Sequence, residues 1–282
     1  MVAKFFIAGF GDEGQRAAWL PRLASGEWVA SVAISEPRVG AHPKMLATRA
    51  EEDGDGYSIT GEKAWVTNGP IAAVFVVFAI MAIDDGRKRY GAFLIARDTP
   101  GLSIAEMPEY RALSPSRHCG LVLEGCHVPH SALLGPAGSA YETMALPFRD
   151  VEDAVGTFGL LGAFRFMLAH LANSAEGDAA TLSLGRMVAL VAVYADSAEA
   201  VVAALDAAEL ARQAAALVGL RVLAAELLQR VRSHREAFGA ADDSAIDRAC
   251  ADLETSLSVA RGPRQARQAR LGQELIVASR RS

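Results

Sequence analysis

Two patterns of apolar and polar positions divide the chain, and each predicts a different kind of structure. From Trp28 to about Gly135, short apolar runs alternate with turn sequences. The runs are WVASVAIS, YSIT, VFVVFAI, YGAFLIA and GLVLEGCHV, and the turns include DGDG, TNGP, DDGRKR and DTPG. Runs rich in valine, isoleucine and phenylalanine between such turns are typical of strands. We therefore predict an antiparallel β-domain over residues 28–138.

Beyond about Tyr141 the pattern becomes helical, because glycine and proline are sparse and alanine, leucine, glutamate and arginine dominate. The clearest helix is expected over residues 206–234, where Leu210, Leu217, Leu220, Ala224, Leu227 and Val231 recur at helical spacing. Other helices are expected at about 148–173, 181–204 and 243–260, with a short one at the C-terminus. We predict a helical bundle over residues 139–282. Residues 1–27 are expected to form one helix with a frayed or docked lead.

The longest apolar run, IAAVFVVFAIMAI from Ile71, bears on membrane association. It is shorter than the roughly 20 residues that a helix needs to cross a bilayer. Its content of valine, isoleucine and phenylalanine predicts a buried strand instead. The first residues lack the apolar region and cleavage site of a signal peptide. We expect no membrane span and a cytoplasmic protein.

Composition and charge argue against several classes of function. The chain has 282 residues, of which 51% are hydrophobic, enough to form a large core. Its formal net charge of -5 provides no basic surface for nucleic acid, so we expect no nucleic-acid partner. The three cysteines lack CxxC spacing, and the histidines show no metal-ligand pattern such as HExxH. Neither a disulfide framework nor a metal site is expected.

Four successive segments resemble landmarks of the acyl-CoA dehydrogenase superfamily. They are DEGQRAAWLPRLASGEWVASVAISEP, DGDGYSITGEKAWVTNG, TPGLSIAEMP and LVLEGCHVPHSALLG, in the family's order and spacing. A looser resemblance continues through LLGAFRFMLAHLA and LGQELIVASR. The resemblance implies an α+β fold, in which an N-terminal helical domain precedes an antiparallel β-barrel-like middle domain and a C-terminal four-helix bundle. Residues 1–27 match only the last helix of that N-terminal domain, and we expect them to be its remnant.

The resemblance also implies a site for FAD. In the family, a strand ending in a Thr-Glu-Pro-like sequence and a Trp-Ile-Thr-Asn-Gly-like turn hold the isoalloxazine ring. The matching positions here are Val32, Ile34, Ser35, Trp65, Val66 and Thr67. Backbone amides and hydroxyls suit the polar edge of a flavin, and an indole ring suits its face. The alternative is that Trp65 is a core residue beside a type I′ turn at Asn68 and Gly69.

The family's reaction also requires a base, because a carboxylate removes the α-proton of an acyl thioester while the β-hydrogen leaves as hydride. Alignment of the terminal motif puts Arg267 at the usual glutamate position, and a guanidinium stays protonated. Isovaleryl-type members carry the base on the first helix of the C-terminal domain, and counting back from LGAFRFMLAH puts Glu152 there. The alternative is that Glu152 is an ordinary acid near a helix N-terminus, like Asp150 and Asp153.

Other motifs depart from the family pattern. The loop after Pro37 reads RVGAH, without the serine and aspartate that help to bind CoA in the family. The Arg-x-x-Phe-Gly-like motif for the adenine end of FAD is missing from NSAEGDAATLSLGR, and ARGPRQARQAR replaces a Gly-Gly turn. The letters REAFG occur much later, and we interpret them as a helix C-terminus capped by Gly239.

Three functions are compatible with these residues. The first is an FAD-dependent, acyl-CoA dehydrogenase-like oxidoreductase acting on an acyl-CoA or other acyl thioester, with Glu152 as base. The second is a non-catalytic partner subunit of a heteromeric acyl-CoA dehydrogenase, and the third is a flavin-free thioester-binding protein of the same fold. Because Ser35, Trp65 and Thr67 are preserved, we adopt the first interpretation. We expect a homo-oligomer or a heteromer with a full-length homologue.

Overall fold

The computed structural model describes residues 2–107, 110, 112–238 and 244–280, so the proposed cap Gly239 lies outside the described residues. The chain forms two compact units, Met1–Arg149 and Asp150–Ser282. Residues 1–27 belong to the same unit as the sheet. The division also falls later than the expected boundary at 138/139, because Tyr141, Met144 and Phe148 are buried in the core of the first unit.

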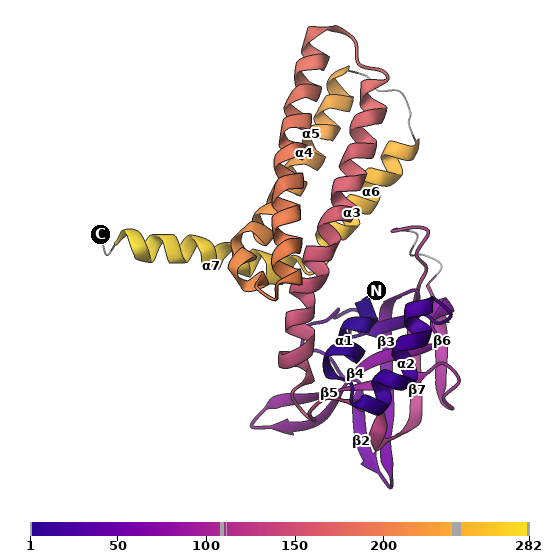
Figure 1. Ribbon diagram of the computed structural model, residues 1–282. Coiled ribbons are helices and arrows are strands. Elements are labelled where there is room, and N and C mark those ends of the chain that lie inside the picture. The colour runs from indigo at the N-terminus through magenta and orange to yellow at the C-terminus, as the bar shows by residue number, and fades with distance from the viewer. Residues whose placement is uncertain (1, 108–109, 111, 239–243, 281–282) are drawn as a thin grey trace. The chain divides into compact units, whose positions relative to one another are not determined.

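The first unit consists of two helices and an eight-stranded sheet (Figure 1). The helices are α1 (Val2–Phe10) and α2 (Glu13–Ser25). The strands are β1 (Ala30–Ala33), β2 (Arg49–Asp53), β3 (Gly56–Thr67), β4 (Val74–Asp84), β5 (Arg87–Ala96), β6 (Leu102–Glu106), β7 (His118–Pro129) and β8 (Leu133–Leu134). A capping box starts α2, since Asp12 accepts a hydrogen bond from the backbone of Gln15 at 2.7 Å and the Gln15 side chain accepts one from the backbone of Asp12 at 2.8 Å. The lead before this helix is therefore a separate helix, α1.

The strands run in the order β6-β7-β3-β2-β4-β5-β8, and β1 pairs with β4. Most pairs are antiparallel, but β1 and β2 each run parallel to β4, so the sheet is mixed. Strands β3 and β4 are not adjacent, because β2 lies between them. Between β3 and β4, Asn68 has a φ of 59° and begins the short 3-10 turn Gly69–Ile71. The alternative of a type I′ hairpin at Asn68 and Gly69 is therefore wrong.

Strand β4 contains the long apolar run, and its side chains enter two cores. Val74, Val76 and Phe78 face one core together with residues of α1. Phe75 and Val77 face the other core, which strands β3 and β7 also line. Successive side chains of a strand point to opposite faces, so a strand covered on both sides must be apolar throughout. The prediction of a buried strand here is confirmed.

The second unit is helical, and its helices largely follow the predicted ranges. They are α3 (Leu146–Ala172), which begins in the first unit, α4 (Gly177–Asp206), α5 (Ala214–Phe238), α6 (Ser244–Ser258) and α7 (Arg261–Ser279). The helix expected from residue 206 begins only at Ala214, because the 3-10 turn Leu210–Gln213 precedes it. The C-terminal helix is 19 residues long rather than short.

Helices α3 to α6 lie alongside one another (Figure 1). They share one hydrophobic core, which includes Phe164, Tyr194, Leu227 and Cys250. This arrangement confirms the α+β fold with a C-terminal helical bundle. By contrast, α7 contributes no buried apolar side chain among the residues that the structure describes, and its Leu275 is 70% exposed.

Two helical segments of the structure, Tyr141–Ala172 and Gly177–Asp206, are long and apolar enough to cross a membrane. Length and composition alone are weak evidence, because core helices of soluble proteins meet the same criteria. Both segments place apolar side chains, such as Phe164 and Tyr194, in the bundle core. Their apolar character is thus partly accounted for by packing within the second unit.

Candidate functional site

The two segments expected to hold a flavin lie side by side in the first unit. The Ser31 hydroxyl on β1 donates a hydrogen bond to the carbonyl of Thr67 on β3 at 2.8 Å. After β1 ends, the backbone amide of Ala64 donates to the carbonyl of Ser35 at 2.9 Å. The structure therefore brings residues 32–35 next to residues 65–67, which are distant in the sequence.

Exposed and buried side chains alternate along this part of β3, so only some of them are accessible to a ligand. The side chain of Trp65 is 40% exposed and Thr67 is also exposed, whereas Val66 between them is fully buried. Val66 packs in the core that β4 and β7 share, so its side chain is not available to a ligand. Only the backbone of Val66 can contribute to a site here.

Trp65 has an unusual backbone conformation. Its φ is 54°, and it lies within a register shift between Lys63 and Val66 in the pairing of β3 with β7. Such bulges reorient side chains and occur frequently beside functional sites. A residue other than glycine in the left-handed region costs on the order of 1–3 kcal/mol, and such strain clusters at ligand sites. The first unit thus holds a large aromatic ring at its surface on a strained backbone.

On the other segment, Val32, Ile34 and Ser35 are partly buried. Val32 and Ile34 pack against the core that α1 covers. Their side chains therefore serve mainly as packing, and the polar groups that this segment offers are its backbone and the Ser35 hydroxyl. These groups match the polar edge of a flavin better than its apolar face.

A buried ion pair fixes the two segments. Lys63 Nζ lies 2.9 Å from Glu36 Oε1, with side-chain exposures of 0% and 7%. Glu36 also accepts hydrogen bonds from the backbone amides of Ala47 and Thr48, at 2.7 and 2.9 Å. Lys63 donates to the carbonyl of Ile34 at 3.2 Å. The pair joins the chain after β1 to β3, two residues before Trp65. The sequence pattern predicts no role for either residue, although a lysine inside an otherwise apolar strand is a signal of a buried charge.

Burial shifts the pKa of each group so as to favour its neutral form, and the attraction between the two charges opposes this shift. Burial lowers the pKa of Lys63 to about 8, against the opposing effect of Glu36. Burial raises the pKa of Glu36, but the charge of Lys63 and the hydrogen bonds from Thr48 and Lys63 outweigh it, so the net pKa is below the usual value of 4.5. Both groups are therefore charged at neutral pH.

The pair should make the first unit sensitive to acid. Because the pKa of Glu36 is lowered by folding, its contribution to stability is complete above pH 4.5 and is lost as the pH falls through the lower, folded value. We expect the free energy of unfolding, measured by urea titration across this range, to fall less steeply with acid in Glu36→Gln than in the wild type. Equal slopes would contradict the assignment.

The two candidate positions for a base lie in the second unit. Glu152 is exposed near the start of the α3 segment in this unit. Arg267 on α7 forms an ion pair with Asp150, at 2.5 Å between Arg267 Nη2 and Asp150 Oδ1. Arg267, which the sequence resemblance places at the usual glutamate position, is thus paired with Asp150, two positions before Glu152 along the chain.

Other reactive groups form no site among the residues described. The cysteines Cys119, Cys126 and Cys250 are buried, and burial raises the pKa of Cys119 to about 11. Within the described ranges, no group of three or more histidine, cysteine, aspartate or glutamate residues is placed to hold a metal ion. The segments around Trp65 and around Glu152 are therefore the sites that carry candidate chemistry.

Comparisons with known proteins agree with this geometry. The family model for the middle domain of acyl-CoA dehydrogenases matches residues 31–126. The mitochondrial isovaleryl-CoA dehydrogenase of Oryza sativa subsp. japonica is 38% identical over 155 residues, which are 54% of this chain and 38% of that protein. The chain thus spans well under half the length of this curated relative.

Solved structures extend the likeness to the bundle. An acyl-CoA dehydrogenase from Geobacillus kaustophilus shares the fold with a TM-score of 0.83 at 21% identity, over 96% of this chain and 74% of that one. A glutaryl-CoA dehydrogenase from Mycobacterium smegmatis in complex with FADH2 has a TM-score of 0.80 at 25% identity, over 97% of this chain and 72% of that one. Residues 31–126 therefore match the middle domain of the acyl-CoA dehydrogenases, and the chain shares the fold of the solved acyl-CoA dehydrogenases.

Proposed function

We propose that this chain is an FAD-dependent oxidoreductase that dehydrogenates the α and β carbons of an acyl thioester. The observation that carries the proposal is Trp65, a half-exposed indole on a strained bulge. A bulky aromatic residue in this conformation has no structural advantage in a strand, whereas it suits stacking on a planar ligand.

The neighbouring groups fit the polar parts of a flavin. Thr67 presents an exposed hydroxyl beside Trp65, and the backbones of Val66 and Ile34 supply further polar groups. The buried pair of Glu36 and Lys63 holds both segments in place. FAD, when bound, supplies the acceptor for the β-hydrogen. The similar glutaryl-CoA dehydrogenase was solved with FADH2, which supports this choice of cofactor.

Glu152 is the proposed base that takes the α-proton. It is exposed in this chain, whereas a base of this kind works best where water is excluded. We therefore propose that another polypeptide covers it, in a homo-oligomer or a heteromer with a full-length homologue. Helix α4 has a suitable apolar surface for assembly, since Leu182, Val188 and Val193 are each more than half exposed.

One observation favours a second candidate, the non-catalytic partner subunit. Arg267, at the position of the usual base, is paired with Asp150 rather than free. This ion pair has a structural role and provides no proton acceptor. In that case the catalytic carboxylate would come from the partner chain.

The visible absorption spectrum of the full chain, with and without added FAD, tests the proposal. We expect a bound-flavin spectrum, and about tenfold weaker FAD binding in Trp65→Ala, because loss of stacking and contact area removes on the order of 1.5 kcal/mol. Phe166→Ala is the matched control, since Phe166 is 41% exposed but lies in the second unit. A colourless protein that takes up no FAD would refute this function and leave the flavin-free role.

The second step of the test assigns the base. An acyl-CoA should bleach the bound flavin of the wild type, and Glu152→Gln should abolish the bleaching without changing FAD binding. Bleaching that appears only after a full-length homologue is added would identify the partner-subunit role.

A further inference from the structure

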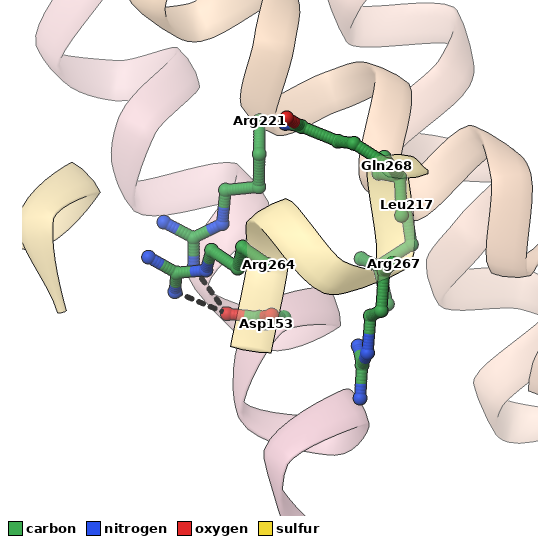
Figure 2. A pocket seen from close by; sticks show the side chains of 7 residues that line it. Asp153, Leu217, Arg221, Arg264, Arg267 and Gln268 are labelled. Atoms are coloured by element: carbon green, nitrogen blue, oxygen red, sulfur yellow. Dashed lines mark hydrogen bonds and ion pairs between the residues drawn. The ribbon is translucent and has the colours of Figure 1, made fainter. Parts of the chain in front are cut away.

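A buried charge cluster lies where α3, α5 and α7 meet in the second unit (Figure 2). Asp153 Oδ1 accepts hydrogen bonds from Nη2 of Arg221 and Nη2 of Arg264, each at 2.7 Å. The exposures of the three side chains are 5% for Asp153, 10% for Arg221 and 13% for Arg264. One carboxylate oxygen therefore serves two buried guanidinium groups.

Asp153 does not provide an acceptor for every N–H donor of these two guanidinium groups. Arg221 Nε, Arg221 Nη1 and Arg264 Nε are buried and have no hydrogen-bond partner among the described protein atoms. Arg264 Nη1 is accounted for, since it donates to carbonyls that end α6, including that of Leu257 at 3.2 Å. Buried donors are rarely left unpaired in native proteins. These three unpaired nitrogen atoms therefore indicate an occupant that the chain itself does not supply.

The same residues line a small pocket with an open mouth. Its lining adds Leu217 and Val218 of α5 and Arg267 and Gln268 of α7 (Figure 2). The pocket measures about 240 Å³ including the mouth, and its enclosed part is about the size of one water molecule. Only a small group fits in the enclosed part of the pocket, so the rest of any ligand would lie in the open mouth.

We propose that this pocket is an anion-binding site that takes one oxyanion group, a carboxylate or a phosphate. Guanidinium groups bind these groups strongly, because their N–H donors form a planar fork that matches the oxygens. The site is distinct from the proposed flavin residues, and it stands whether or not the chain binds FAD. Water alone is the competing occupant, and it would give no anion-dependent effect.

Thermal unfolding of the full chain in inorganic phosphate or acetate, against sodium chloride at equal ionic strength, tests the site. We expect a saturable rise of the unfolding midpoint, since a ligand that binds the folded state stabilises it by mass action. Arg221→Lys keeps the charge but loses the fork, and should weaken binding about tenfold. Arg270→Lys is the matched control, because Arg270 lies on α7 with an 81% exposed side chain and should not change the affinity.

Arg267→Gln provides a second variant if Arg221→Lys fails to fold, because it leaves both hydrogen bonds to Asp153 intact. It should weaken binding several-fold. A response to phosphate alone or to acetate alone would identify the group, and a response to both would establish a general oxyanion site. The proposal would be overturned if phosphate and acetate raise the unfolding midpoint no more than chloride does. It would also be overturned if they raise the midpoint of Arg221→Lys and of Arg267→Gln as much as that of the wild type, since non-specific salt effects do not depend on one arginine.

Discussion

Replacing Lys63 with methionine is expected to lower the free energy of unfolding of the first unit by about 3–5 kcal/mol, because it leaves a buried carboxylate without its cation. Glu36 is 7% exposed at its side chain and accepts two backbone hydrogen bonds, so it cannot turn to solvent without breaking them. Urea denaturation followed by tryptophan fluorescence measures this unit selectively, since the three tryptophans, Trp19, Trp28 and Trp65, all belong to it.

A double mutant separates the ion pair from general damage. Lys63→Met combined with Glu36→Gln should be less destabilised than the sum of the two single variants, because the unpaired charge is gone. Lys44→Met is the control, since Lys44 is exposed and should change stability by no more than about 0.5 kcal/mol. Additive effects of Lys63→Met and Glu36→Gln would show that the pair contributes nothing beyond packing. We also expect weaker FAD binding in Lys63→Met, because the pair positions Trp65.

Local sequence patterns predicted much of the fold. Apolar runs and turn sequences identified the strands β1, β3, β4, β5 and β7, and helical spacing identified α3 to α6 within several residues. Strands β2 and β6 were missed, because RAEED and LSIAE carry mostly polar or partly exposed residues and have no apolar run. Local pattern also cannot specify that β2 lies between β3 and β4, since strand order depends on contacts between distant segments.

The candidate sites show the same division between local and long-range information. The motif around Trp65 was visible in the sequence, but its exposure and its positive φ depend on the bulge against β7. Asp153 appeared only as one of several acids at a helix start. Its partners Arg221 and Arg264 lie 68 and 111 positions away along the chain, so no local pattern could pair them. The features that the sequence pattern does not predict are therefore ion pairs between residues that are distant along the chain.

Asp153→Asn is expected to lower the free energy of unfolding of the second unit by about 3–5 kcal/mol. The substitution keeps the size of the side chain but removes the charge that two buried guanidinium groups share. The loss should appear in urea denaturation followed by the helical circular dichroism signal, to which this unit contributes most of the helices.

The neighbouring Asp150 is a matched control for this variant. Asp150→Asn removes one ion pair with Arg267, in which the Asp150 side chain is 41% exposed. It should therefore lower the free energy of unfolding by no more than about 1 kcal/mol. Asp153→Asn should also release α7, because Arg264 links that helix to α3 and α7 adds no buried apolar side chain among the described residues. Limited proteolysis should then cut α7 faster than in Asp150→Asn. Equal stabilities and equal cleavage rates for the two variants would show that burial of the Asp153 cluster does not hold this helix in place.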